Sequence, residues 1–186
     1  MTPSTHLELG ITKISLILGI TILLGSCNAV KNVTQDQLLL TKNTIEVDGQ
    51  KVDDFGVFSQ LTQRPNTKIP LIGIPAGLHL YNLADQQPDS TFTTWLEKKT
   101  KREQRLIRLL SKKQLNELGN YNVGFNQWLK KSGDAPEIIN ETKTKKSQER
   151  IKQWYAKKGW FNVKVGYDVT KNKRKASRAE ITYNVT

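Results

Sequence analysis

The single cysteine of the chain, Cys27, is the residue whose surroundings most directly predict a chemical modification. It follows Leu24, Gly25 and Ser26, and this "LGSC" run resembles a lipobox. In a lipobox the cysteine thiol is acylated and the cysteine becomes the new N-terminus after cleavage. A single cysteine also excludes an intrachain disulfide and a cysteine-rich metal site. We therefore predict a lipid anchor at Cys27.

The segment that precedes Cys27 has the pattern of a secretory signal. Lys13 comes before the apolar run 14–24, and small residues follow that run. This length is typical of a signal peptide, whereas a membrane-spanning helix needs about 20 apolar residues. Residues 1–26 are therefore expected to be a lipoprotein signal peptide. An ordinary cleaved signal and an uncleaved anchor are alternatives, because Glu8 offsets the one Lys of the N-terminal region.

Side chains that perform acid–base or nucleophilic catalysis are sparse. His6 lies in the expected signal, which leaves His79 alone in an apolar-flanked loop. The sequence contains no G-x-S-x-G nucleophile motif, no Walker loop and no G-x-G-x-x-G. We expect no enzymatic activity, no catalytic residues, no cofactor and no metal site, and we interpret His79 as a packing or surface residue.

The charge of the chain favours an anionic partner. It has 29 Lys and Arg against 17 Asp and Glu, a formal charge of +12. The expected signal contains one Lys and one Glu, so the excess belongs to the exported part. Export argues against nucleic acid, and an RNA-binding module would also need base-stacking aromatic residues in an RNP-type pattern. We therefore expect no nucleic-acid partner.

Alternating apolar residues predict three strands. The first surrounds Ile45 and Val47 and ends at the turn signal Asp48-Gly49. Two further strands, over 161–169 and 179–185, are joined by a basic turn and have matching apolar sets. This pattern predicts an antiparallel hairpin with one buried face.

Helical spacing predicts the other elements. We expect a helix capped by Asp53, a short helix around Trp128, and a helix capped by Thr144 that ends at Gly159. Residues 66–90 contain Pro70 and Pro75 and are expected to be irregular, as an insertion. Strands and helices in this order indicate an α+β fold.

A further helix, over about 94–118, is expected to be basic and amphipathic. Its cations form either a solvated face or a contact with anionic lipid headgroups or an acidic partner. The residues concerned are Lys98, Lys99, Lys101, Arg102, Arg105, Arg108, Lys112 and Lys113.

Three of these segments together resemble a known domain. "IEVDG" at 45–49, "KKGWFNVKV" at 157–165 and "AEITYNV" at 179–185 resemble the POTRA domain of outer-membrane assembly factors of the BamA/TamA type, the surface antigen family. Trp160 stands where that family usually has Tyr. With "LGSC" and "GLHLYNL", the chain looks like a lipidated subgroup. The resemblance implies a β-α-α-β-β fold: a small three-stranded sheet covered by helices on one face.

The resemblance also implies a domain organisation. Residues 27–42 would be a lipidated tether, and 43–186 a POTRA-like domain with a partly helical insertion at about 66–140. The protein would be anchored in the outer membrane of a Gram-negative bacterium through Cys27 and would face the periplasm. It would be either the N-terminal portion of a longer assembly factor or a lipoprotein with an isolated domain.

The function that the resemblance implies is the binding of unfolded outer-membrane polypeptides or partner subunits by β-augmentation. An alternative is a membrane-anchored accessory lipoprotein whose segment 94–118 contacts anionic lipid or an acidic partner. A hairpin that only completes the sheet is the structural alternative to a binding edge. The expected edge strand consists of Phe161, Asn162, Val163, Lys164, Val165, Gly166, Tyr167, Asp168 and Val169.

Overall fold

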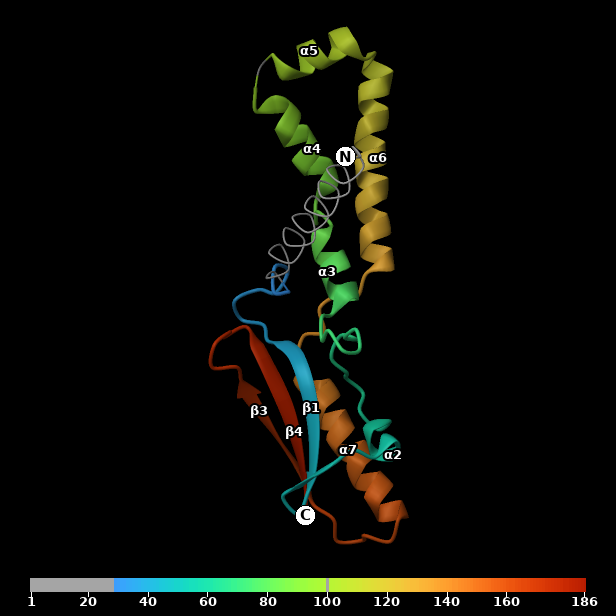
Figure 1. The fold of residues 1–186 in the computed structure, drawn as a ribbon, viewed down its shortest axis with the longest axis vertical. Helices are drawn as coiled ribbons and strands as arrows, with labels where there is room; N and C mark the ends of the chain where they lie inside the picture. Colours follow the sequence, from blue (N-terminus) through green and yellow to red (C-terminus); the bar gives the residue numbers. More distant parts are fainter. Residues whose placement is uncertain (1–28, 100) are drawn as a thin grey trace, which may run out of the picture.

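The computed structural model describes residues 29–99 and 101–186. The expected signal peptide and Cys27 lie outside the described residues. The described part is elongated: a sheet with helices on one face forms one end, and a helical arm, residues 76–132, extends from it (Figure 1). The fold class is α+β, as the sequence predicts.

The sheet has four strands in the order β2-β1-β4-β3. They are β1 (Leu39–Val47), β2 (Gln50–Val52), β3 (Val165–Lys171) and β4 (Arg178–Val185). Parallel pairing joins β1 to β4, whereas β2 and β3 run antiparallel to their neighbours. The expected three-stranded sheet therefore gains a fourth strand, β2, because Asp48 and Gly49 both have positive φ and turn the chain back along β1.

The alternation in β4 explains why one face of the sheet is covered. Ala179, Ile181, Tyr183 and Val185 are all inaccessible to solvent, whereas the residues between them are half-buried. The closing hairpin is therefore confirmed, with Val169 opposite Ile181.

Helix α7 (Glu141–Lys157) supplies most of the cover (Figure 1). Its buried residues recur at helical spacing and include Ile151 and Tyr155. Asn140 caps the helix by accepting from the Lys143 N–H at 3.0 Å. The expected cap, Thr144, is wrong: it lies inside the helix, buried, and donates to the Asn140 carbonyl. The predicted end is confirmed, since Gly159 has a φ of 96° just after the last turn.

Strand β1 begins earlier than the sequence suggests. Leu39 and Leu40 already belong to it, and both are buried. The sequence presents them as an apolar patch in a polar stretch, and only the pairing with β4 makes them part of the sheet. After β2 the chain forms the short helix α2 (Phe55–Phe58), which Asp54 caps, one residue beyond the expected Asp53.

The arm consists of α3 (Ala76–Leu83), α4 (Pro88–Glu97), α5 (Arg102–Leu109) and α6 (Lys112–Ser132). Two expectations are wrong here. Residues 66–90 contain helical segments, because Pro88 occupies the first position of α4, where a missing N–H breaks no helical bond. A single helix over 94–118 is interrupted, because Ser111 and Gln114 form a reciprocal capping box that starts α6.

The arm joins the sheet through close contacts. Ala29, Leu39 and Leu78 form a small buried cluster at its base. Within the arm, the end of α6 crosses α3 closely. A Cβ at Gly133 would lie 2.4 Å from the Tyr81 backbone nitrogen. The Asp134 N–H donates to the Gly77 carbonyl at 2.9 Å in the same place.

Candidate functional site

The free edge of β3 is one end of the sheet, since β3 pairs with β4 alone among the strands of the described part. Lys164 and Thr186 exchange both backbone hydrogen bonds, at 2.7 and 2.9 Å. In an antiparallel pair, hydrogen-bonded residues alternate with residues whose backbone groups point the other way. Tyr167, Val169 and Lys171 therefore direct their N–H and C=O groups to the free edge.

One group at this edge already has a partner. The Gln148 side chain on α7 donates to the Val165 carbonyl at 2.5 Å. The part of the edge that remains open to another chain thus begins after Val165 and extends to Lys171. It contains no proline and no bulge in its pairing with β4. Prolines and bulges commonly protect an exposed edge from pairing, and this edge has neither.

The strand starts later than the sequence suggests. Residues 161–164 precede it, and the Val163 N–H donates to the Trp160 carbonyl in a turn. The Trp160 ring lies 5.2 Å from the Tyr155 ring, which holds the chain against the end of α7. Phe161 is 85% exposed, whereas Val163 and Val165 are buried in the core. The expected edge residues therefore divide into a turn and a strand.

The uncovered face of β3 is polar. Gly166 and Asp168 are exposed there, and the Asn184 amide on β4 donates to the Asp168 carboxylate at 2.7 Å. On the covered face, burial beneath α7 raises the pKa of the Tyr183 hydroxyl, which stays neutral at physiological pH. A strand added at this edge would thus continue a sheet with one polar and one apolar face.

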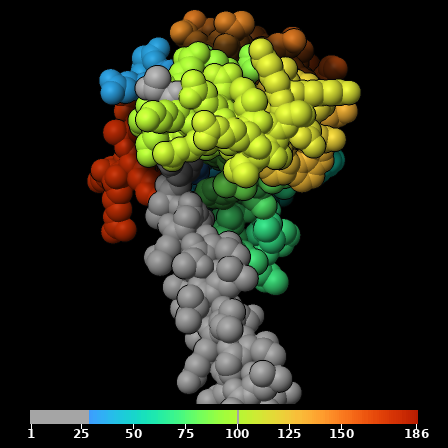
Figure 2. All heavy atoms as spheres, turned by 90° about the horizontal axis from the view of Figure 1, so that it is seen from above, coloured from blue at the N-terminus to red at the C-terminus, as the bar shows by residue number. Residues whose placement is uncertain are grey.

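The basic residues expected on one helix are divided along the end of the arm. Three lie in the connection between α4 and α5, three on α5 and two at the start of α6. These segments make up the yellow-green end seen in Figure 2. Arg102 is partly used within the arm, since its guanidinium lies 4.4 Å from the Trp95 ring centroid. The other members of the set, Lys98, Lys99, Lys101, Arg105, Arg108, Lys112 and Lys113, are exposed.

The arm also carries an apolar stripe that the sequence reading missed. Leu118, Tyr121, Phe125 and Trp128 recur at helical spacing on α6 and are 47–73% exposed. The rings of Phe125 and Trp128 stack with centroids 5.9 Å apart. The spacing was visible in the sequence, but its exposure was not, because an apolar helix face usually packs on a core.

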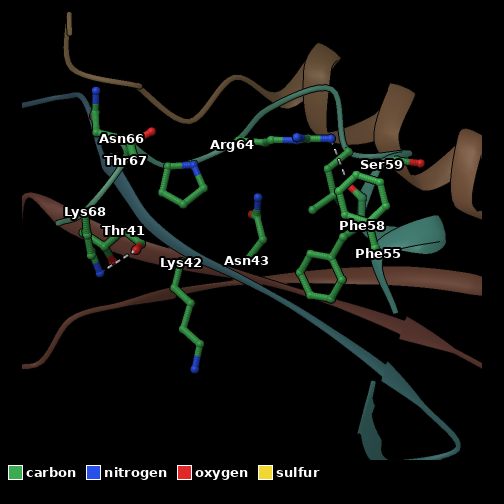
Figure 3. Close-up of a pocket in the computed structure, with 12 residues that line it drawn as sticks. Thr41, Lys42, Asn43, Phe55, Phe58, Ser59, Arg64, Asn66, Thr67 and Lys68 are labelled. Atoms are coloured by element: carbon green, nitrogen blue, oxygen red, sulfur yellow. Dashed lines mark hydrogen bonds between the residues drawn. The ribbon is translucent and has the colours of Figure 1, made fainter. Parts of the chain in front are cut away.

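A second missed feature is a groove of about 440 Å³ beside β1. Asn43 lies in its middle, between the rings of Phe55 and Phe58 and the segment 64–68 (Figure 3). The groove forms only when residues 55–68 fold back beside β1, and the sequence pattern does not reveal that placement.

The described residues contain no cluster of His, Cys, Asp and Glu that could hold a metal ion. His79 lies half-buried on helix α3, so its expected position in a loop is wrong. Within residues 29–99 and 101–186, no helix is long and apolar enough to cross a membrane.

Comparison with known proteins identifies part of the chain. Residues 97–186 match the family model POTRA, described as a surface antigen variable number repeat. No curated protein and no solved structure matches the chain. The match includes α5, α6, α7, β3 and β4, and therefore contains the edge of β3.

POTRA domains generally interact with polypeptide substrates or assembly partners, and they are generally non-catalytic scaffold or binding domains. Proteins of this family are typically associated with the outer membrane of Gram-negative bacteria. The α+β fold with a four-stranded mixed sheet agrees with the match. The match over residues 97–186 is therefore consistent with a POTRA domain of a BamA-type family.

Proposed function

We propose that this protein binds unfolded outer-membrane polypeptides, or subunits of an assembly machinery, by β-augmentation at the edge of β3. A POTRA domain suggests a role in outer-membrane protein assembly or translocation in general. The observation that carries the finer proposal is the outward direction of the Tyr167, Val169 and Lys171 backbone groups. An extended client would pair with them and become a fifth strand of the sheet.

This edge suits a binder with little sequence preference. Each of the three residues presents one donor and one acceptor, and a backbone hydrogen bond contributes about 0.5–1.5 kcal/mol net. Client side chains would lie alternately over the polar face and over the covered side, near the 40%-exposed Val169. Affinity would come mainly from the backbone, so many different clients would fit.

In this function residues 43–186 would act as one POTRA-like unit with 66–140 inserted. The parallel pairing of β1 with β4 supports this, because it joins a strand outside the family match to a strand inside it. The protein would be held in the outer membrane, facing the periplasm, by acylated Cys27.

Two proline substitutions test the edge. The Val169 N–H points outward, so Val169→Pro is expected to keep the fold and weaken binding of a labelled strand peptide from an outer-membrane protein about tenfold or more. The Thr170 N–H points toward β4, so Thr170→Pro is expected to cost about 1–3 kcal/mol of unfolding free energy. Fluorescence anisotropy measures the first effect and chemical denaturation the second.

Together, Val169→Pro and Thr170→Pro distinguish a loss of peptide binding from a loss of stability. Circular dichroism confirms that Val169→Pro is folded before binding is measured. Unchanged affinity in that folded variant would refute augmentation at β3.

A second candidate function is contact of the arm with the membrane surface. The stripe of Tyr121, Phe125 and Trp128 lies on the arm that also carries the basic end face. Aromatic and basic residues of this kind favour an anionic lipid interface. Ala29, two residues after Cys27, packs against Leu78 at the base of the arm. An anchor at Cys27 would thus hold the arm close to the bilayer.

Vesicle binding without the anchor tests this candidate. The Cys27→Ser protein is expected to bind anionic but not neutral vesicles. Replacing Lys98, Lys99 and Lys112 with Gln should weaken that binding roughly a hundredfold, since each cation near the surface contributes about 1 kcal/mol. Vesicle co-sedimentation gives the readout.

The matched control replaces three exposed cations of α7, Lys146, Lys152 and Lys157, with Gln. An equal loss in both triple variants would show that overall charge, not the arm, attracts the protein to lipid.

A further inference from the structure

The outer edge of β1 is left unpaired over a short stretch. Strand β2 pairs with Ile45–Val47, and Ile138 forms an isolated bridge with Leu39. Between these two contacts the chain leaves the edge, because β2 ends at Val52 and Asp54 caps α2. The gap lies on the side of the sheet opposite to the edge of β3.

Alternation places the backbone of Asn43 in this gap. Val47 and Gln50 flank the two-residue turn and are a hydrogen-bonded pair, as is Ile45 with Val52. The Asp48 N–H donates the other way, to the Val185 carbonyl on β4 at 2.9 Å. Residues 43, 45 and 47 therefore point away from β4. Asn43 is the one of these three that β2 does not reach.

The side chain of Asn43 is also incompletely bonded. It is only 9% exposed, and its Nδ2 donates to the Gln63 carbonyl at 2.8 Å. Its Oδ1 is buried and accepts no hydrogen bond from any described residue. A buried amide oxygen without a donor is destabilising, and a donor from a ligand would remove that cost. Asn43, which carries this Oδ1 atom, lines the groove (Figure 3).

The groove around Asn43 is basic. Lys42, Arg64 and Lys68 line it, and no Asp or Glu does. None of these three cations forms an ion pair within the described residues. Lys68 reaches only the Thr41 carbonyl, at 3.3 Å. At one end the ring of Phe55 is 84% exposed, which offers an apolar surface beside the cations.

From these contacts we infer that the groove beside β1 is a second polypeptide site, which binds an extended acidic peptide segment. The peptide backbone pairs with the N–H and C=O of Asn43 and donates to its Oδ1. Carboxylates of the peptide lie against Arg64 and Lys68, and an apolar side chain covers Phe55. Because this groove lies by the edge of the sheet opposite to the β3 edge, the protein can bind two peptide segments at once.

The test uses a short capped peptide in which Glu and Val alternate, with a Lys-for-Glu peptide as its counterpart. Amide resonances report the position of binding: shifts at Thr41 and Asn43 are expected with the Glu peptide and not with the Lys peptide. N-methylation at alternate residues of the Glu peptide is expected to remove the shifts, since it removes the donors.

Charge reversal measures the contribution of the cations. Lys42→Glu, Arg64→Glu and Lys68→Glu together are expected to weaken binding of the Glu peptide about tenfold or more. All three residues are exposed, so the variant should fold. The same reversal at Lys98, Lys99 and Lys112 on the arm is the matched control and should change the affinity less than about twofold.

Three results would overturn the inference: shifts confined to Tyr167–Lys171, equal binding of the two peptides, or equal loss in the two triple variants. The first would leave augmentation at β3 intact, and Val169→Pro tests that edge separately. The two sites can therefore fail independently.

Discussion

Replacing Ile181 with alanine is expected to lower the free energy of unfolding by about 2–5 kcal/mol. Ile181 is fully buried on β4, the strand that pairs with both β1 and β3, and it belongs to the core that α7 covers. Alanine would leave a cavity at the centre of the sheet. Small domains have only about 5–15 kcal/mol of stability, so this loss should be visible in chemical denaturation.

The neighbouring residue provides the control. Thr182 lies on the opposite face of the same strand and is half-buried, so Thr182→Ala should cost less than about 1 kcal/mol. Similar losses for the two variants would mean that the covered face is not the core of the domain.

The largest effect in the arm is expected at the crossing of α3 and α6. In Gly133→Ala the new Cβ would lie 2.4 Å from the Tyr81 nitrogen and 2.8 Å from the Gly77 carbonyl oxygen. Both contacts are with backbone, so relief requires the helices to move apart, at about 1–3 kcal/mol or more. Hydrogen exchange of the α3 amides measures the loss locally, and thermal denaturation measures it globally.

Gly124 provides a control of opposite sign. It lies within α6, and a Cβ there would meet nothing within 4 Å. Gly124→Ala is expected to stabilise the helix by about 0.5–1 kcal/mol. If both substitutions stabilised the protein, the close crossing at Gly133 would be wrong.

The sequence predicts the sheet region better than the arm. In β4 the strict alternation of Ala179 through Val185 determines both the strand and its buried face. The end of α7 follows from Gly159, whose backbone conformation few other residues adopt. Both features depend on local physics, which a sequence displays directly.

The helices of residues 94–118 were harder to divide because the composition of this segment favours a helix throughout. Only the pairing of Ser111 with Gln114 divides α5 from α6, and this signature was present in the sequence but was overlooked. The cap of α7 is a similar case, since the sequence analysis predicts Thr144 and the structure has Asn140. Both residue types cap helices, and burial of Thr144 against the sheet decides between them.

The candidate sites divide in the same way. Alternation in the sequence predicts that β3 is a strand. Its outer edge is free because of the strand order in the folded sheet, which alternation does not predict. The groove beside β1 forms because residues 55–68 fold back against β1. Gln63 holds this segment in place by bonding to Asn43 and to the carbonyl of Ile138, which is distant in sequence. Long-range placement of this kind has no signature in a single sequence.

The central place of β4 has a consequence for how the protein is made. β1 and β4 are paired although their contacting residues Thr41 and Ala179 are 138 positions apart. β4 lies between β1 and β3 in the sheet. Neither β1 nor β3 can therefore pair with β4 until β4 has been synthesised. Closing so long a loop is slow. Both edges therefore form only after β4 has paired, and a nascent chain that lacks β4 presents neither proposed site.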